Sequence, residues 1–164
     1  MRHFKLVSVT SLLCCTLAYS SANFADDVYC DAKLHLTTRN QVYQFIHWLN
    51  AVGSYEKISE RDIADYFAPS FKYIVNGKIG AINATQLHKR YVLSQQQYQL
   101  AYIQFPLTDI LIDCNKAALQ YTVTYVDKRG VHRTSHNTAI VKYNDHGKID
   151  VFSQSYDIGT PLTA

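Results

Sequence analysis

The chain has 164 residues, of which 48% are hydrophobic and 18% are charged, and its formal net charge is +3. This composition excludes a disordered or fibrous protein and predicts one soluble globular domain. Six Gly and three Pro leave little sequence for flexible linkers, whereas 13 Tyr beside 7 Phe and one Trp is a marked tyrosine bias. Because tyrosine combines apolar area with a hydroxyl group that needs a partner, the bias predicts a wet, aromatic-lined surface or cavity.

The first 22 residues have the features of a secretory signal peptide. Arg2 and Lys5 precede an apolar run that is too short to span a bilayer, and Ser20 and Ala22 are small residues at the −3 and −1 positions of a cleavage site. We therefore expect a signal peptide at 1–22 and a single mature domain at 23–164. The expected location is secreted or periplasmic, with no membrane span after the signal is removed.

Cleavage at this position changes both the charge and the cysteine count. Loss of Arg2 and Lys5 leaves 14 basic residues against 13 acidic ones, so the net charge is about +1 and nucleic acid is not an expected partner. Of the four cysteines, only Cys30 and Cys114 remain. In an oxidising compartment this pair is expected to form a disulfide, and two separately buried thiols are the alternative.

The first half of the mature chain contains two helix signals. Thr37–Thr38 can cap a helix whose apolar residues recur with helical spacing until Gly53. Ser59 and Asp62 have the spacing of a capping box, and Pro69 ends the short helix that this box predicts.

Hairpin and strand signals follow. Asn76-Gly77 predicts a type I′ turn between strands at 71–75 and 78–82, and Asn83 with Gln86 predicts the start of a third helix that extends to about residue 97. The period then changes from helical to alternating. The expected strands are at about 100–113, with Pro106 as a bulge or edge, and at 116–126, 131–143 and 148–157.

The resulting order is α-α-β-β-α-β-β-β-β. Helices gathered on one face of a curved antiparallel sheet make an α+β cone, in which three helices pack against the sheet, and not a parallel doubly wound fold.

This order and two local stretches resemble the nuclear-transport-factor-2-like (NTF2-like) superfamily, which includes SnoaL-like polyketide cyclases, ketosteroid isomerase and scytalone dehydratase. The run 65–71 is similar to the family's passage from the second helix into the first strand, and 145–149 with Tyr156-Asp157 resembles its last hairpin and closing strand. The resemblance covers about residues 38–158 and implies an NTF2-like cone. Ser70 occupies a position where many relatives carry an acidic residue.

The register of the last two hairpins predicts a candidate site on the sheet. If Asp127 pairs with Gly130, then Tyr121 lies opposite His136, and pairing of Asn144 with Gly147 continues the same face. We expect this face to be concave and covered by the helices. Its polar end carries Tyr121, Tyr125, His132, Thr134, His136, Ser153, Ser155 and Asp157.

Proton-transfer catalysis would need a base and a donor to a developing oxyanion. His136 or Asp157 is the candidate base and Tyr121 the candidate donor. The candidate ligand-binding residues are Tyr125, His132, Thr134, Ser153 and Ser155. In the alternative interpretation these side chains are core residues with satisfied hydrogen bonds.

No metal or cofactor is expected. His132 and His136 are four residues apart, about 13 Å along a strand that rises ~3.3 Å per residue, which is too far for one ion. The sequence contains no CxxC, HExxH, GxGxxG, P-loop or GxSxG motif.

We therefore expect an exported NTF2-like (SnoaL-like) domain that binds a small hydrophobic or carbonyl-containing molecule in its cone. It would act as a binding protein or as a cofactor-free isomerase, dehydratase or cyclase. The alternative is a non-catalytic interaction or assembly module that uses the convex sheet face, as in VirB8-type secretion components, and a homodimer through the sheet is a further expectation. A pocket of a few hundred Å³ would favour ligand binding, and a cone filled by side chains would favour the module.

Overall fold

The computed structural model describes residue 30, residues 32–54 and residues 56–161, so the predicted signal peptide lies outside the described residues. The helices are α1 (Ala32–Gly53), α2 (Glu60–Tyr66) and α3 (Ala84–Gln97). The strands are β1 (Phe67–Val75), β2 (Lys78–Ala81), β3 (Tyr98–Ile103), β4 (Asp109–Asp113), β5 (Lys116–Asp127), β6 (His132–Tyr143) and β7 (Ile149–Pro161). No helix in these ranges is long and apolar enough to cross a membrane.

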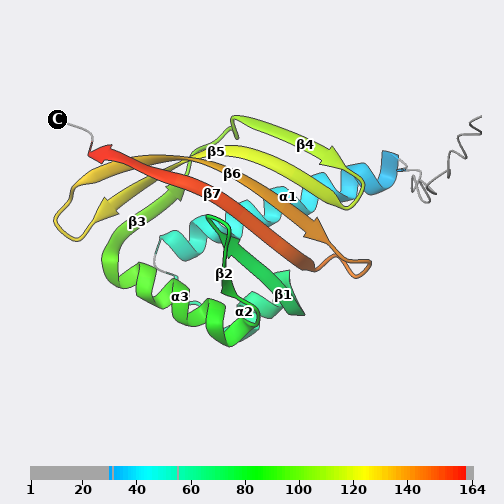
Figure 1. Ribbon diagram of the computed structural model, residues 1–164, viewed down its shortest axis with the longest axis horizontal. Helices are drawn as coiled ribbons and strands as arrows, with labels where there is room; N and C mark the ends of the chain where they lie inside the picture. Colours follow the sequence, from blue (N-terminus) through cyan, green and yellow to red (C-terminus); the bar gives the residue numbers. More distant parts are fainter. Residues whose placement is uncertain (1–29, 31, 55, 162–164) are drawn as a thin grey trace, which may run out of the picture.

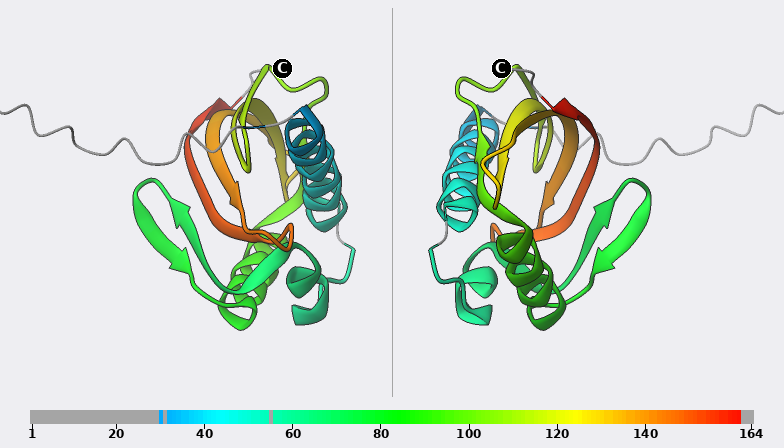
Figure 2. Two further views of the ribbon diagram at one scale, coloured as in Figure 1. Left: turned by 90° about the vertical axis from the view of Figure 1, so that its right-hand side faces the viewer. Right: turned by 90° about the vertical axis from the view of Figure 1, so that its left-hand side faces the viewer.

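One curled sheet contains all seven of these strands, in the order β2-β1-β7-β6-β5-β3, and β4 also pairs with β5. Figure 1 shows the long strands β5, β6 and β7 arching over the helices. In Figure 2, α1 lies along the concave side of the sheet and the β1–β2 hairpin diverges from the other strands. The expected α+β cone, with helices on the concave side of a curved sheet, is confirmed. The sheet is mixed and not purely antiparallel, because β1 and β7 run parallel.

Short-range sequence signals predicted the small elements correctly. Ser59 and Asp62 form the reciprocal capping box of α2, and the Asn83 side chain caps α3. Asn76 and Gly77 have φ angles of 48° and 76°, as a type I′ turn requires, and they join β1 to β2. Each of these features depends on neighbours in sequence, which is why the sequence alone was sufficient.

The predicted start of α1 is wrong, because the helix begins at Ala32 and not after Thr37–Thr38. The Thr37 hydroxyl donates to the carbonyl of Lys33 at 2.9 Å, one helical turn back. The buried Thr38 hydroxyl donates to the carbonyl of Cys114 at 2.6 Å. These threonines therefore lie inside the helix, and Thr38 fixes it to the turn between β4 and β5.

The single strand expected at 100–113 is divided into β3 and β4. Both segments pair with β5, β3 with its end and β4 with its beginning. The chain leaves the ladder around Pro106, because proline has no amide hydrogen to donate to a partner strand.

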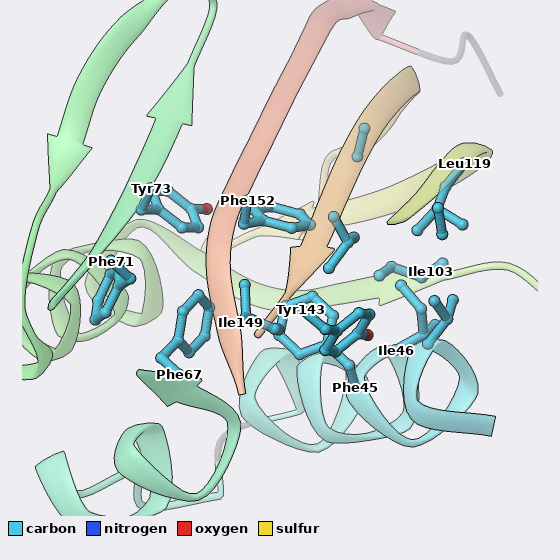
Figure 3. Close-up of a cluster of buried hydrophobic side chains, with 14 of the residues drawn as sticks. Phe45, Ile46, Phe67, Phe71, Tyr73, Ile103, Leu119, Tyr143, Ile149 and Phe152 are labelled. Atoms are coloured by element: carbon cyan, nitrogen blue, oxygen red, sulfur yellow. The ribbon is translucent and has the colours of Figure 1, made fainter. Parts of the chain in front are cut away.

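Aromatic rings fill the part of the cone that lies beside the middle of α1. The Phe45 ring is fully buried, with ring centroids of Phe67 and Phe152 at 5.6 and 5.3 Å in edge-to-face contact. Figure 3 shows these rings between α1 and strands β1 and β7. The final turns of α1, which carry Leu49 and Val52, line a cavity instead.

Candidate functional site

A cavity of about 360 Å³ lies between the end of α1, α3, β3 and the concave face of the sheet. Six of its lining residues are tyrosines: Tyr73, Tyr91, Tyr98, Tyr121, Tyr125 and Tyr156. Its apolar lining includes Leu49, Val52, Leu93, Ala101, Ile103, Val123 and Phe152. The tyrosine-lined cavity expected from the composition is therefore present, and its volume falls in the range of small-molecule sites.

The Gln154 amide connects two of the tyrosines on the wall of the sheet. The Tyr121 hydroxyl donates to Gln154 Oε1 at 3.0 Å, and Gln154 Nε2 donates to the Tyr73 hydroxyl oxygen at 3.0 Å. Tyr121 and Tyr73 are only 3% and 6% exposed. This chain of hydrogen bonds fixes three polar side chains from β5, β7 and β1 at one surface of the cavity.

A second polar group lies along the same wall. Asn137 Nδ2 donates to the Ser135 hydroxyl at 2.8 Å, and both side chains are buried. Burial raises the pKa of Tyr125, and a hydrogen bond with Ser135 opposes that increase. The sheet therefore presents hydroxyl and amide groups to the cavity, whereas α1 presents aliphatic side chains.

Burial also determines the protonation state of the tyrosines. It raises the pKa of Tyr73, Tyr91 and Tyr121 well above the usual 10.0 of a phenol. These groups are neutral at physiological pH, so they donate hydrogen bonds and do not act as bases. Arg90 is the one lining residue with a permanent charge, and the described lining includes no Asp, Glu or His.

The structure places only two of the predicted site residues in this cavity, Tyr121 and Tyr125. His132 and His136 are exposed on the opposite, convex face of the sheet, where Thr134 also lies. Tyr121 lies opposite Asn137 and not opposite His136. The predicted register between β5 and β6 is therefore wrong by one residue.

The turn between β5 and β6 explains this displacement. The amide of Asp127 donates to the carbonyl of Val131 at 3.0 Å, and the amide of Gly130 donates to that of Asp127 at 2.9 Å. Gly130 has a φ of 79°, as in a three-residue turn that ends in a glycine bulge. Asp127 therefore pairs with Val131 instead of Gly130, and every side chain of β6 points to the face opposite to the predicted one.

The side chains of β7 from Phe152 onward also lie on the face opposite to the predicted one. The amide of Asn144 donates to the carbonyl of Lys148, and a bulge follows between Ile149 and Val151. These two single-residue shifts add up to two residues. The same side chains of β6 and β7 therefore share a face as predicted, although the pairing between the strands is displaced by two residues. The residues that move to the convex face with β6 are Ser153, Ser155 and Asp157, and those that face the cavity instead are Phe152, Gln154 and Tyr156.

The candidate base residues remain neighbours at their corrected position. His136 pairs with Asp157 across β6 and β7, and its Nδ1 lies 3.2 Å from the Thr122 hydroxyl. This group is on the far side of the sheet from Tyr121. The structure therefore does not bring the predicted base and the predicted donor to one site.

Cys30 and Cys114 lie side by side as thiols, and no disulfide joins them. A hydrogen bond with Cys30 and partial burial raise the pKa of the Cys114 thiol to about 11. The two cysteines predicted to pair are therefore neighbours, and the predicted disulfide is not shown.

Sequence reasoning missed Tyr73, Tyr91, Arg90 and Gln154 as site residues. Tyr91 belongs to the apolar stripe of α3, and Tyr73 lies two residues after Phe71 on the same face of β1, so the sequence pattern predicted an inward position for both. Nothing in the sequence distinguishes Gln154 from the other polar residues of β7. Among the residues that the structure describes, no cluster of three or more His, Cys, Asp or Glu side chains could hold a metal ion.

Comparison with known proteins gives a match at the level of structure alone. A scan against protein-family models finds no match, and no curated protein sequence matches the chain. A protein from Jannaschia sp. CCS1 described as a SnoaL-like polyketide cyclase superposes with a TM-score of 0.61 and 9% identity, covering 78% of this chain and 89% of that one.

Two further solved structures are similar to the same extent. An NTF2-like protein from Anabaena variabilis has a TM-score of 0.60 and 8% identity over 76% of this chain and 90% of that one. A LEH-like epoxide hydrolase from M. tuberculosis has a TM-score of 0.57 and 11% identity over 75% of this chain and 84% of that one. The chain thus has the fold of the NTF2-like superfamily, with the cavity in the cone of that fold.

Proposed function

We propose that this chain is an exported protein that binds a small hydrophobic or carbonyl-containing molecule in its cone. The observation that supports the proposal is the cavity of about 360 Å³ with its six tyrosines. Ligand sites of small molecules are typically about 300–1,000 Å³ and combine an apolar lining with a few polar groups. The similarity to proteins described as a polyketide cyclase and an epoxide hydrolase agrees with the use of this cone for small molecules.

The two walls of the cavity define the kind of ligand. Leu49 and Val52 of α1 supply an apolar wall, and the sheet opposite supplies Tyr121, Asn137 and Gln154. A flat ring system with oxygen atoms along one edge would contact aliphatic groups on one side and hydrogen-bonding groups on the other. Aromatic rings of the tyrosines add contacts that favour a planar body.

Binding without proton transfer fits these residues better than isomerase, dehydratase or cyclase chemistry. A general base must lie within hydrogen-bond reach of the proton that it removes. The described lining offers neutral phenols, amides and a guanidinium group, and the predicted bases His136 and Asp157 are on the convex face. If the protein is nevertheless an enzyme of this kind and uses these two residues, His136→Gln and Asp157→Asn would abolish turnover of a ligand that the cavity binds.

The binding proposal is tested with a cavity-blocking variant. Ala101 of β3 lines the cavity, whereas Gln99 of the same strand is exposed. We expect a panel of hydrophobic aromatic carbonyl compounds to raise the melting temperature of the wild-type protein and of Gln99→Phe, but not that of Ala101→Phe. Stabilisation of all three proteins alike, or of none, would contradict binding in the cone.

Export is the second part of this proposal. It is supported by the sequence of residues 1–22, with cleavage after Ala22 leaving the described fold, from Cys30 onward, in one piece. Expression of the full chain should give a secreted or periplasmic protein whose first residue is Asn23. An uncleaved N-terminus on protein recovered from the cytoplasm would refute export.

A specific feature of the convex face favours self-association as a second candidate function. Leu111, Ala118 and Ile140 form one cross-strand row, and Leu111 and Ile140 are 67% and 52% exposed. A two-fold axis near Ile140 would pack the exposed Ile140 side chains of the two copies against each other. We propose a homodimer through this face as the form in which the sheet would act as an assembly module.

Sedimentation analysis tests the dimer. We expect the wild-type protein to be dimeric and Ile140→Lys, which places a charge on the axis, to be monomeric. Thr85→Lys on α3 is the control for added charge, since Thr85 is exposed and α3 packs against α2, β1, β2 and β3. A wild-type monomer at every accessible concentration would refute this interface.

A further inference from the structure

One corner of the cavity has more hydrogen-bond donors than acceptors. Tyr73, Tyr91 and Tyr121 each carry one hydroxyl donor, and the Gln154 side chain offers them a single carbonyl oxygen. If the Gln154 amide is oriented as observed, Tyr121 donates to it and Tyr73 only accepts from it. With the amide reversed, Tyr73 would donate to the amide oxygen and Tyr121 would accept from the amide nitrogen. In either orientation, one of the two phenol protons therefore has no amide oxygen to donate to.

The Tyr91 hydroxyl increases this excess. It is buried, and the Tyr73 hydroxyl lies beside it without a hydrogen bond of good geometry between the two. The Tyr91 ring stands edge-on to the Tyr73 ring with centroids 6.4 Å apart, so the two side chains lie at the same corner. A buried hydroxyl without a well-formed hydrogen bond is costly, and a ligand oxygen that accepted from it would remove that cost.

Arg90 gives the corner a positive charge. Its guanidinium carbon lies 5.8 Å from the centroid of the Tyr73 ring, and among the described residues no acidic side chain forms an ion pair with it. Gly80 makes this approach possible. A Cβ atom at Gly80 would lie 3.2 Å from Arg90 Nη1 and 3.3 Å from Tyr73 Cδ1, which is tighter than ordinary contact.

From these observations we infer that the corner of Tyr73, Tyr91 and Arg90 binds a carboxylate group of the ligand. Two neutral phenols would donate to the carboxylate oxygens and the guanidinium group would neutralise the charge, which makes charge-assisted hydrogen bonds. The apolar body of the ligand would then extend along Leu49 and Val52. This inference rests on the proposed function, since it assigns a ligand class to the same cavity. It predicts an aromatic carboxylic acid in preference to a neutral aromatic carbonyl compound.

A matched pair of probes tests the inference. 2-Naphthoate and methyl 2-naphthoate share the same rings and differ in the charge on the oxygen atoms. By calorimetry at pH 7, we expect the wild-type protein to bind the acid at least ~10-fold more tightly than the ester. Tyr73→Phe, Tyr91→Phe and Arg90→Gln should each reduce this ratio about 3- to 10-fold, because each removes one interaction with the carboxylate. Tyr73→Phe also removes the hydrogen bond from Gln154, but that loss affects both probes and cancels in the ratio.

Tyr98→Phe is the control variant. Tyr98 lines the cavity and packs against Tyr125, with tilted rings and 5.1 Å between centroids, and not against Tyr73 or Tyr91. This variant should keep the wild-type ratio. Urea unfolding of each variant establishes that it is folded, and the substitutions by Phe retain the ring and its packing.

The outcomes separate the two proposals. If the ester binds as tightly as the acid, or if Tyr98→Phe lowers the ratio as much as Tyr73→Phe and Tyr91→Phe do, the carboxylate corner is refuted while binding in the cone stands. If only Arg90→Gln lowers the ratio, the effect is a general surface charge and the corner is refuted as well. If neither probe binds and the carbonyl panel also leaves the melting temperature unchanged, the proposed function fails and this inference fails with it.

Discussion

The hydrogen bond between Tyr121 and Gln154 can be measured by a double-mutant cycle. Tyr121→Phe removes one hydrogen bond of 3.0 Å, which should cost about 1 kcal/mol of unfolding free energy. Gln154→Leu removes that bond and the one to Tyr73, and leaves a Tyr121 hydroxyl that is only 3% exposed without its acceptor. We expect it to cost about 2–3 kcal/mol.

The double variant separates the pair from its surroundings. Once Gln154 is Leu, loss of the Tyr121 hydroxyl removes an unsatisfied group, so the two changes together should cost about 1–2 kcal/mol less than the sum of the single ones. Urea unfolding followed by the fluorescence of Trp48, the only tryptophan, gives these values. Trp48 suits the purpose because it stacks on Tyr66 at 4.7 Å, in the aromatic core and outside the cavity lining.

A second cycle is the control. Tyr98→Phe combined with Gln154→Leu should be additive within about 0.3–0.5 kcal/mol, since no hydrogen bond joins Tyr98 to Gln154 in the structure. An interaction energy between Tyr121 and Gln154 no larger than in this control would show that the amide does not organise the wall of the cavity.

Three further predictions concern the turn, the cysteines and the buried phenols. Gly130→Val should lower the unfolding free energy by about 1–2 kcal/mol because φ at this position is 79°, and a value within error of Ser153→Ala on the convex face would refute the glycine bulge. Cys30 and Cys114 should resist alkylation after mild oxidation and react once reduced, and two alkylated thiols in the oxidised protein would rule out the bridge. Stability should be constant up to about pH 10 and fall above it, because the unfolded chain then releases phenol protons that the folded state retains. Chemical unfolding between pH 8 and pH 11 measures this slope, which should be shallower in Tyr73→Phe; an unchanged slope would contradict burial of that phenol.

Much of the fold could be predicted because it is encoded in local patterns. The capping box at Ser59 and the Asn76-Gly77 turn act through bonds between residues a few positions apart. The change from a helical to an alternating period of apolar residues predicted the strands of the sheet. The resulting order of elements was sufficient to predict the NTF2-like cone. The start of α1 was missed because the Thr38 hydroxyl bonds to Cys114, a partner 76 residues away, and not to its own helix.

The tyrosine bias predicted that a cavity exists but not which residues form its polar corner. Tyr73, Tyr91 and Gln154 come from β1, α3 and β7, and only the curl of the sheet brings them together. The periodicity of apolar residues predicts that a side chain points inward. It does not predict which other inward side chains it contacts.

By itself, the sequence determined most of the elements, their order and the tyrosine-rich interior of this protein, but not the division of the strand at 100–113 or the start of α1. The tertiary structure decided which face of the sheet each residue of β6 and β7 occupies. Strand side chains alternate with a period of two, so one residue in the β5–β6 turn, where Asp127 pairs with Val131, was enough to move His136 and Asp157 to the convex face. That choice depends on hydrogen bonds across the turn and on the burial of Asn137 and the partial burial of Gln154 on the concave face, which no local sequence pattern reveals.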